Sequence, residues 1–136
     1  MLKSILRGGT VLGLITVLGA FTLTACSAVI QYSVLDRAAT PTDTLPAGVL
    51  DSDAEIAFSS SRFIGVDDGV SLWLAAPAEK YGICLIVYPD EQSWSVACSG
   101  SGLEVDSGSG AHYAVYPDGT PDKEGMRRIS RNVFAN

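Results

Sequence analysis

The sequence predicts an all-β fold. We expect a single small antiparallel domain of about seven strands, arranged as hairpins or a meander with one disulfide, after an N-terminal apolar helix and a tether. From Arg62 onward, short apolar runs alternate with clusters of Gly, Pro, Asp and Ser, which is the pattern of strands and turns. Cys84 and Cys98 lie within this region and form an even pair suited to a disulfide. No long stretch of the region has the apolar period of a helix.

The first residues have the composition of an export signal. Lys3 and Arg7 are the only charges before an uncharged apolar run that spans residues 8–25. A positive start, an apolar middle and small residues at the end are typical of a signal peptide over residues 1–25. The run is also close to the roughly 20 residues that span a bilayer, so its length alone leaves an uncleaved helix open.

The end of the run favours cleavage. Leu23-Thr24-Ala25-Cys26 resembles the lipobox of bacterial lipoproteins, in which an aliphatic residue and two small residues precede a Cys. The resemblance implies that residues 1–25 are removed and that Cys26 is lipidated on sulfur, usually with its amine acylated as well. Two chains on one residue give stable attachment to a membrane.

The alternative is a single-pass membrane protein with the same apolar run retained. No cluster of Lys or Arg follows the run, which argues against a cytoplasmic C-terminal domain. Both interpretations place the domain on the outer face of the cell membrane.

Charge excludes some partners. Seven basic and fifteen acidic residues follow residue 25, so that part of the chain has a net charge of −8. An acidic chain has no electrostatic reason to bind nucleic acid or an anionic membrane surface.

Residues 26–61 are expected to form the lipidated N-terminus, a tether and a lead-in. Residues 38–46 are small, polar and twice interrupted by Pro, which suits an extended spacer. Val29, Ile30, Val34 and Leu35 have helical spacing and could continue a helix from the membrane. Residues 52–55 (Ser-Asp-Ala-Glu) have the form of a capping box, although only a short helix could follow.

The strands then follow in order within residues 62–136. Residues 63–66 and 70–76 flank Asp68-Gly69, a strong hairpin signal. In the second run, Val70, Leu72, Leu74 and Ala76 share one face and Trp73 lies on the other. Ile83–Tyr88 is almost wholly apolar, as in a central strand covered on both faces. The remaining strands are expected at 94–98, 103–105, 113–116 and 129–134.

The disulfide predicts a register for one hairpin. If Cys84 pairs with Cys98 across antiparallel strands, Ile86 faces Val96 and Tyr88 faces Trp94. All six side chains then lie on one face of the sheet. A cross-strand Cα separation also suits a disulfide. Two free buried thiols are the alternative.

The sequence predicts no catalytic constellation, no metal site and no cofactor, and therefore no enzyme. His112 is the single histidine, and we expect it to be exposed or at a sheet edge. The adjacent acids Asp67-Asp68 and Asp90-Glu91 lie at predicted turns, where solvated carboxylates are ordinary.

Four aromatic residues are candidates for a ligand-binding surface, with nearby acids to bind hydroxyl groups: Trp73, Trp94, Tyr88 and Tyr116. The alternative is that these rings fill the core of a small domain.

Several short motifs are similar to those of small exported proteins of actinobacteria, which combine a signal or membrane segment, a linker and one domain with paired cysteines. They are Thr42-Asp43-Thr44-Leu45-Pro46, Ser61-Arg62-Phe63-Ile64-Gly65, Val70–Ala75, Cys84-Leu85, Pro117-Asp118-Gly119 and Asn132-Val133-Phe134. The resemblance implies a surface location and supplies no catalytic residue.

The predicted function is that of a membrane-anchored cell-envelope lipoprotein serving binding or interaction, with an unknown protein or an envelope glycan as partner. An enzyme acting on envelope polymers and an accessory or structural subunit of a membrane complex are the alternatives. Aromatic residues gathered with acids on one exposed face would favour binding. A cleft containing His112 and two carboxylates would favour catalysis.

Overall fold

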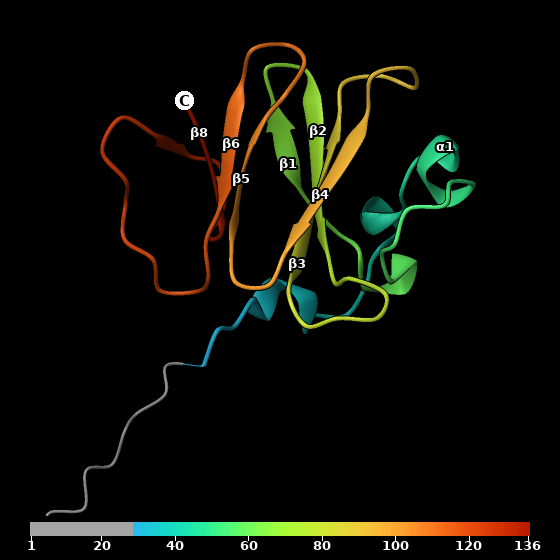
Figure 1. The fold of residues 1–136 in the computed structure, drawn as a ribbon, viewed down its shortest axis with the longest axis horizontal. Helices are drawn as coiled ribbons and strands as arrows, with labels where there is room; N and C mark the ends of the chain where they lie inside the picture. The colour runs from blue at the N-terminus through green and yellow to red at the C-terminus, as the bar shows by residue number, and fades with distance from the viewer. Residues whose placement is uncertain (1–28) are drawn as a thin grey trace, which may run out of the picture.

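The computed structural model describes residues 29–136, so the predicted signal peptide and the predicted lipidation of Cys26 lie outside the described part. The chain forms two four-stranded antiparallel sheets, ordered β1-β2-β3-β4 and β5-β6-β8-β7 (Figure 1). The all-β prediction is confirmed, with eight strands instead of about seven. The strands are β1 Arg62–Asp67, β2 Val70–Ala75, β3 Ile83–Tyr88, β4 Ser95–Ser99, β5 Leu103–Asp106, β6 His112–Val115, β7 Arg127–Arg128 and β8 Val133–Ala135.

The β1–β2 hairpin forms where Asp-Gly predicted it. Asp68 and Gly69 both have positive φ, 47° and 81°, as a two-residue turn matched to the twist of the strands requires. Asp67 pairs with Val70. Further along, the register shifts between Phe63 and Gly65, which leaves Ile64 as a bulge in β1.

The predicted disulfide and register are confirmed. Cys84 and Cys98 are bonded and directly opposite, and Ile86 pairs with Val96. The pairing ends at Val87 and Ser95, so the expected Tyr88–Trp94 pair is not part of the ladder. Both rings still lie on the face of the sheet that carries the disulfide.

The main core lies between the two sheets and follows the period of two. Val70, Leu72 and Leu74 of β2 face it, as do the odd-numbered residues of β3, β6 and β8. Trp73 of β2 points to the opposite, outer face of the first sheet, as predicted. β3 is buried along its length, except for partly exposed Tyr88, which confirms a central strand.

Residues 32–61 pack against the two sheets, and the expected extended spacer at 38–46 is not seen. Tyr32 joins the core between the sheets, and Leu45, Val49 and Ile56 cover the outer face of the first sheet. This segment adds a third layer, to the right of the first sheet in Figure 1. Its elements are short: η1 Ser33–Leu35, η2 Pro41–Asp43, α1 Ala47–Leu50 and η3 Phe58–Ser60.

The helical turns of residues 32–61 do not lie where the sequence patterns predicted helices. The α-helical turn α1 ends before Ser52, and the expected capping box at 52–55 is followed only by the 3-10 turn η3 at Phe58–Ser60. A capping box is instead formed by Thr40 and Asp43 at η2. Near the start of the described chain, helical spacing produces only the single turn η1.

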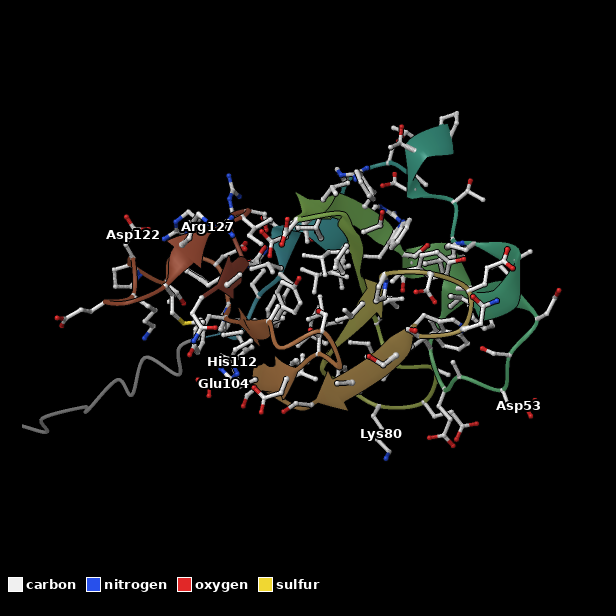
Figure 2. The ribbon with its side chains drawn as sticks, turned by 90° about the horizontal axis from the view of Figure 1, so that it is seen from above. Asp53, Lys80, Glu104, His112, Asp122 and Arg127 are labelled. Carbon is white, nitrogen blue, oxygen red and sulfur yellow. A yellow bond between two sulfur atoms is a disulfide. The ribbon has the colours of Figure 1, made fainter. Side chains whose placement is uncertain are left out.

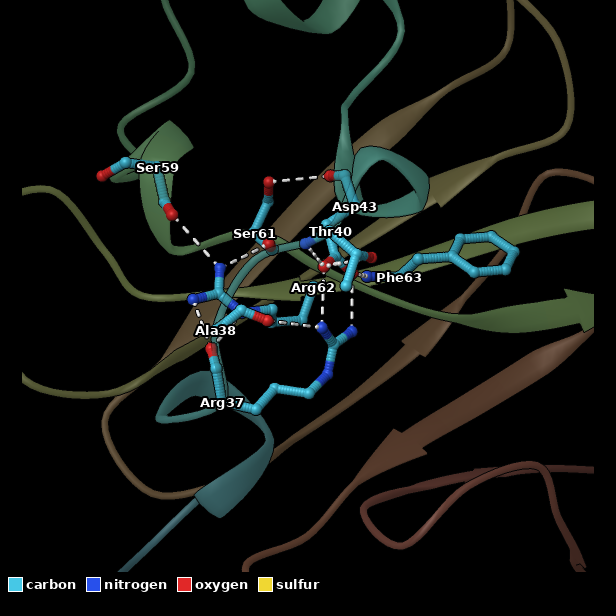
Figure 3. A network of polar contacts seen from close by, with 8 residues as sticks. All are labelled: Arg37, Ala38, Thr40, Asp43, Ser59, Ser61, Arg62 and Phe63. Carbon is cyan, nitrogen blue, oxygen red and sulfur yellow. Dashed lines mark hydrogen bonds and ion pairs between the residues drawn. The ribbon is translucent and has the colours of Figure 1, made fainter.

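The buried carboxylate of Asp43 explains why this segment is ordered (Figure 3). It accepts hydrogen bonds from both Nη atoms of Arg37 at 2.7 and 2.6 Å, from the Thr40 N–H at 2.7 Å and from the Phe63 N–H at 2.7 Å. The Arg37 guanidinium, together with these N–H groups, holds the pKa of Asp43 well below its usual range despite burial. One carboxylate thus joins η1, η2 and β1.

Arg62 reinforces the same junction. Its side chain is buried and donates to the backbone oxygens of Arg37, Ser59 and Ser61 at 2.8–3.1 Å. The charge is therefore solvated by carbonyl groups, which stand in for water. The network crosses from residue 37 to residue 62, so no local pattern could reveal it.

The expected strand at 129–134 forms only at its end, because β7 stops at Arg128, residues 129–132 form a turn and β8 begins at Val133. The Ser130 hydroxyl accepts the N–H groups of Asn132 and Val133 at 3.3 and 3.2 Å. The buried Asn132 amide donates to the Tyr116 carbonyl and to Asp118 at 3.0 and 2.9 Å. These side-chain hydrogen bonds compete with strand pairing, so residues 129–132 form a turn instead of a strand.

Candidate functional site

Three of the four aromatic candidates lie on the outer face of the first sheet. Trp73 is only 6% exposed and packs edge-on against Phe63 and Tyr88, with ring centroids 5.2 and 6.3 Å apart. Its indole Nε1 is buried and has no hydrogen-bond partner among the described residues. Trp73 is therefore a core residue, while Tyr88 and Trp94 remain partly exposed at the border of this cluster.

Acidic side chains accompany these two partly exposed rings. Tyr88 ends β3, and the turn that follows carries Asp90 and Glu91, both exposed. Burial, and then the negative charges of Glu91 and Asp90, raise the pKa of the Tyr88 phenol. We call Tyr88, Asp90, Glu91 and Trp94 the aromatic–acidic edge.

The edge has a defined boundary on one side. A Cβ atom added to Gly48 of α1 would lie 3.8 Å from Trp94 Nε1, so α1 borders the indole ring. Asp90 caps its own turn by accepting the Gln92 N–H at 2.9 Å, which orders the loop between the two rings. The arrangement offers ring faces for stacking and carboxylates that accept hydrogen bonds from hydroxyl or amine groups.

Tyr116, the fourth aromatic candidate, lies apart from the other three. It follows β6 in the second sheet, where its hydroxyl donates to Glu104 at 2.7 Å and its ring packs edge-on against Phe134 with centroids 5.6 Å apart. The Lys123 ammonium lies 4.7 Å from the ring centroid. The bond to Glu104, then burial, raises the pKa of Tyr116.

His112 lies between two carboxylates. Its Nδ1 is 2.6 Å from Asp106 Oδ1 and its Nε2 is 3.6 Å from Glu104 Oε2, as the neighbouring labels in Figure 2 show for Glu104. The β5–β6 pairing places Asp106 opposite His112, and no local sequence motif indicates this contact. The side chain of His112 is 28% exposed and those of Glu104 and Asp106 are 57% and 86% exposed.

His112, Glu104 and Asp106 bring an imidazole and two carboxylates together, which is one part of the arrangement that would favour catalysis. The other part is a cleft around them. His112 lines none of three cavities formed by the described residues. The trio's other side-chain hydrogen bond within residues 29–136 comes from Tyr116, so no serine or cysteine stands beside the imidazole as a nucleophile.

The largest of these cavities, about 510 Å³, lies beside the disulfide, at the end of the first sheet opposite to the β3–β4 turn. Residues 77–81 form one wall of the cavity, and its other walls are formed by Glu55, Cys98, Ser99 and Gly100. A second hollow of about 360 Å³ lies between η1 and the β7–β8 turn, with Arg37 and Arg131 in its wall.

Two further properties concern residues 29–136 alone. Within this part, no three His, Cys, Asp or Glu side chains converge in a way that would hold a metal ion. No helix in the same range has the length and apolar character needed to cross a membrane.

Comparison of the chain with protein-family models, with curated proteins and with solved structures found no match.

Proposed function

We propose that this protein is a lipid-anchored binding module on the outer face of the cell membrane, attached through Cys26, and that it is not an enzyme. The aromatic–acidic edge is the observation that carries the binding role. Tyr88 and Trp94 border the buried cluster around Trp73 while staying partly exposed, and exposed Asp90 and Glu91 lie between them in the chain. This is the combination of rings and acids that favours binding over catalysis.

The chemistry of the edge favours a glycan as the ligand. Aromatic faces pack against the apolar faces of sugar rings, and carboxylates accept hydrogen bonds from sugar hydroxyls. The acids of the edge and the net charge of −8 after residue 25 disfavour a polyanionic polymer. The partner we propose is therefore a neutral or amine-bearing envelope glycan.

The position of the edge suits this role. The β3–β4 turn lies at the end of the first sheet opposite to the one where the described chain begins (Figure 1). A module anchored through its N-terminus would thus present the edge away from the attachment point.

The binding proposal is tested with full-length protein purified from membranes in detergent and co-sedimented with isolated, insoluble envelope polysaccharide. Trp94→Ala, and Asp90→Asn combined with Glu91→Gln, should each weaken binding at least tenfold. Glu124→Gln, which removes an exposed acid on another loop, should bind as the native protein does. Equal binding by all four proteins, or no binding by the native protein, would reject the edge as a glycan site.

The anchoring proposal has a separate test. Mass spectrometry of the protein from native membranes should find Cys26 as the first residue, carrying an acyl mass. An intact Met1 peptide in the mature pool would overturn lipidation and favour the single-pass alternative.

A further inference from the structure

The chain is attached to the folded body almost as soon as it leaves the proposed anchor. The Gln31 carbonyl accepts the Asp118 N–H at 2.9 Å, and the Ser33 N–H donates to the Asp118 carboxylate at 3.0 Å. Between them, Tyr32 is 8% exposed and its hydroxyl donates to the Ser101 carbonyl at 2.7 Å. From residue 31 onward the chain is part of the body, and no spacer remains in the described segment.

Chain length then limits the distance from the membrane. Gln31 is five positions after Cys26, and a fully extended chain covers at most about 3.6 Å per residue, or about 18 Å in total. The headgroup layer of one leaflet takes about 5–8 Å of that distance. The surface around Gln31 is therefore held within about 10–13 Å of the lipid headgroups, which is less than two Debye lengths of about 8 Å at physiological salt.

Two other segments lie at the same end of the molecule. Residues 99–102, which include the partner of the Tyr32 hydroxyl, connect β4 to β5. The β2–β3 loop lies against this connection, because a Cβ atom added to Gly82 would be only 2.2 Å from the Ser99 carbonyl oxygen. Figure 1 shows this loop and the first turn of the described chain together below the sheets. We call residues 29–31, 80–81 and 131 the anchor-proximal face.

Two positive charges without an ion-pair partner among residues 29–136 lie on this face. Arg131 donates to Ser33 Oγ at 2.9 Å, and neither it nor Lys80 forms an ion pair within the described chain. Lys80 extends away from the body in Figure 2. The remaining basic groups are occupied: Arg37 by Asp43, Arg127 by Asp67, Arg128 by Asp122, Arg62 by carbonyl groups and Lys123 by the Tyr116 ring.

An aromatic side chain accompanies these charges. Tyr81, beside Lys80, is 100% exposed, so its whole ring is accessible for contact. Tyrosine is enriched where one end of the ring meets apolar groups and the other meets water, as at a membrane surface. The opposite end of the first sheet instead exposes acids, among them Asp68, Asp90 and Glu91.

We propose that the anchor-proximal face lies against the outer leaflet of the membrane, with Lys80 and Arg131 facing phospholipid phosphates and Tyr81 in the headgroup layer. The net charge predicts no attraction to an anionic surface, and exposed Asp36 and Glu79 lie near these cations in the chain, so the attachment near residue 26 holds this face at the lipid and the two cations make individual contacts. The inference rests on the proposed attachment near residue 26. It assigns the module one fixed orientation, with the aromatic–acidic edge facing outward.

Photocrosslinking in native membranes tests this orientation. A photoreactive phenylalanine analogue replaces Tyr81 in one full-length variant and Gln92, an exposed residue of the β3–β4 turn, in another. Lipid adducts identified by mass spectrometry should be at least fivefold more abundant at position 81. Equal adducts at both positions, no adduct at 81, or more at 92 would overturn the proposal.

Charge reversal tests the role of the two cations. Lys80→Glu combined with Arg131→Glu, in the variant with the photoreactive group at position 81, should reduce lipid adducts at least threefold while the protein still sediments with membranes. Unchanged adducts would show that phosphate contacts do not hold this face.

The two proposals fail in different ways. If Cys26 is lipidated but position 81 crosslinks no better than position 92, the orientation is wrong and the anchor stands. If Met1 is retained and position 81 still crosslinks to lipid, the anchor is wrong and the orientation stands, because the apolar run ends next to residue 26 in either case.

Discussion

Removing the charge of Asp43 should destabilise the protein far more than removing the charge of an exposed acid in the same kind of ion pair. Oδ1 of Asp43 accepts from Arg37 and the Phe63 N–H, and Oδ2 accepts from Arg37 and the Thr40 N–H. In Asp43→Asn one oxygen becomes an NH₂ group, so either orientation of the amide leaves one backbone N–H without its acceptor.

The magnitude follows from the burial of each partner. An unsatisfied buried donor costs about 1–3 kcal/mol. The lost pairing with Arg37 adds at most about 1 kcal/mol, because that side chain is 40% exposed and the pair is screened by water. Asp43→Asn should therefore lower the free energy of unfolding by about 1–4 kcal/mol.

The chain offers a matched control. Asp122 contacts Arg128 at 2.6 Å, the same distance as the Asp43–Arg37 pair, but the Asp122 side chain is 82% exposed against 3% for Asp43. Asp122→Asn should cost less than about 1 kcal/mol. Urea unfolding followed by tryptophan fluorescence measures both variants. If the two losses agree within 0.5 kcal/mol, about the spread expected of independent surface changes, burial of Asp43 does not decide its contribution.

The same variant predicts a pH dependence. The pKa of Asp43 is held below its usual range in the folded state, so its charge stabilises the fold above the unfolded pKa of about 3.9, and this stabilisation is lost as pH falls. The deficit of Asp43→Asn relative to the native protein should be constant between about pH 7 and pH 5 and shrink below about pH 4. A deficit that grows with acidity would contradict the assigned direction.

Two further changes test the first sheet. Replacing both Cys84 and Cys98 by Ala opens a loop with a sequence separation of 14 and should lower the free energy of unfolding by about 3 kcal/mol in the chain-entropy account; a loss below about 1 kcal/mol in urea unfolding would contradict it. Gly82→Ala places a Cβ atom 2.2 Å from the Ser99 carbonyl oxygen at a φ of 145° and should lower the melting temperature sharply, whereas Gly108→Ala meets nothing within 4 Å and should change it little. Similar melting temperatures for the two glycine variants would show that the loop moves aside freely.

Local sequence determined the first sheet because its signals act over short distances. Asp68-Gly69 encodes a turn that only residues tolerant of positive φ can form. The alternation of Val70, Leu72 and Leu74 assigns one face of β2 to the core. Cys84 and Cys98 fixed a register that the ladder then follows through Ile86 and Val96.

Tertiary contacts determined the structure at positions where the local sequence pattern gave no prediction or a wrong one. The small, polar run at 38–46 has the composition of a spacer, but the Asp43 carboxylate bonds to the Phe63 N–H, twenty residues away. The strand expected at 129–134 begins only at Val133, because Asn132 forms hydrogen bonds with Tyr116 and Asp118. No window of neighbouring residues contains such pairs.

The candidate surfaces divide in the same way. The sequence predicts Trp73, Tyr88, Trp94 and Tyr116 as one set of candidates. In the fold, Trp73 is buried, Tyr88 and Trp94 lie at the border of the same cluster, and Tyr116 packs in the second sheet. A net charge of −8 is a property of the sequence. The fold decides which cations have no ion-pair partner, because ion pairs form between residues that are close in space and not in sequence. The contact of Arg131 with Ser33, 98 positions away, is an example of such proximity.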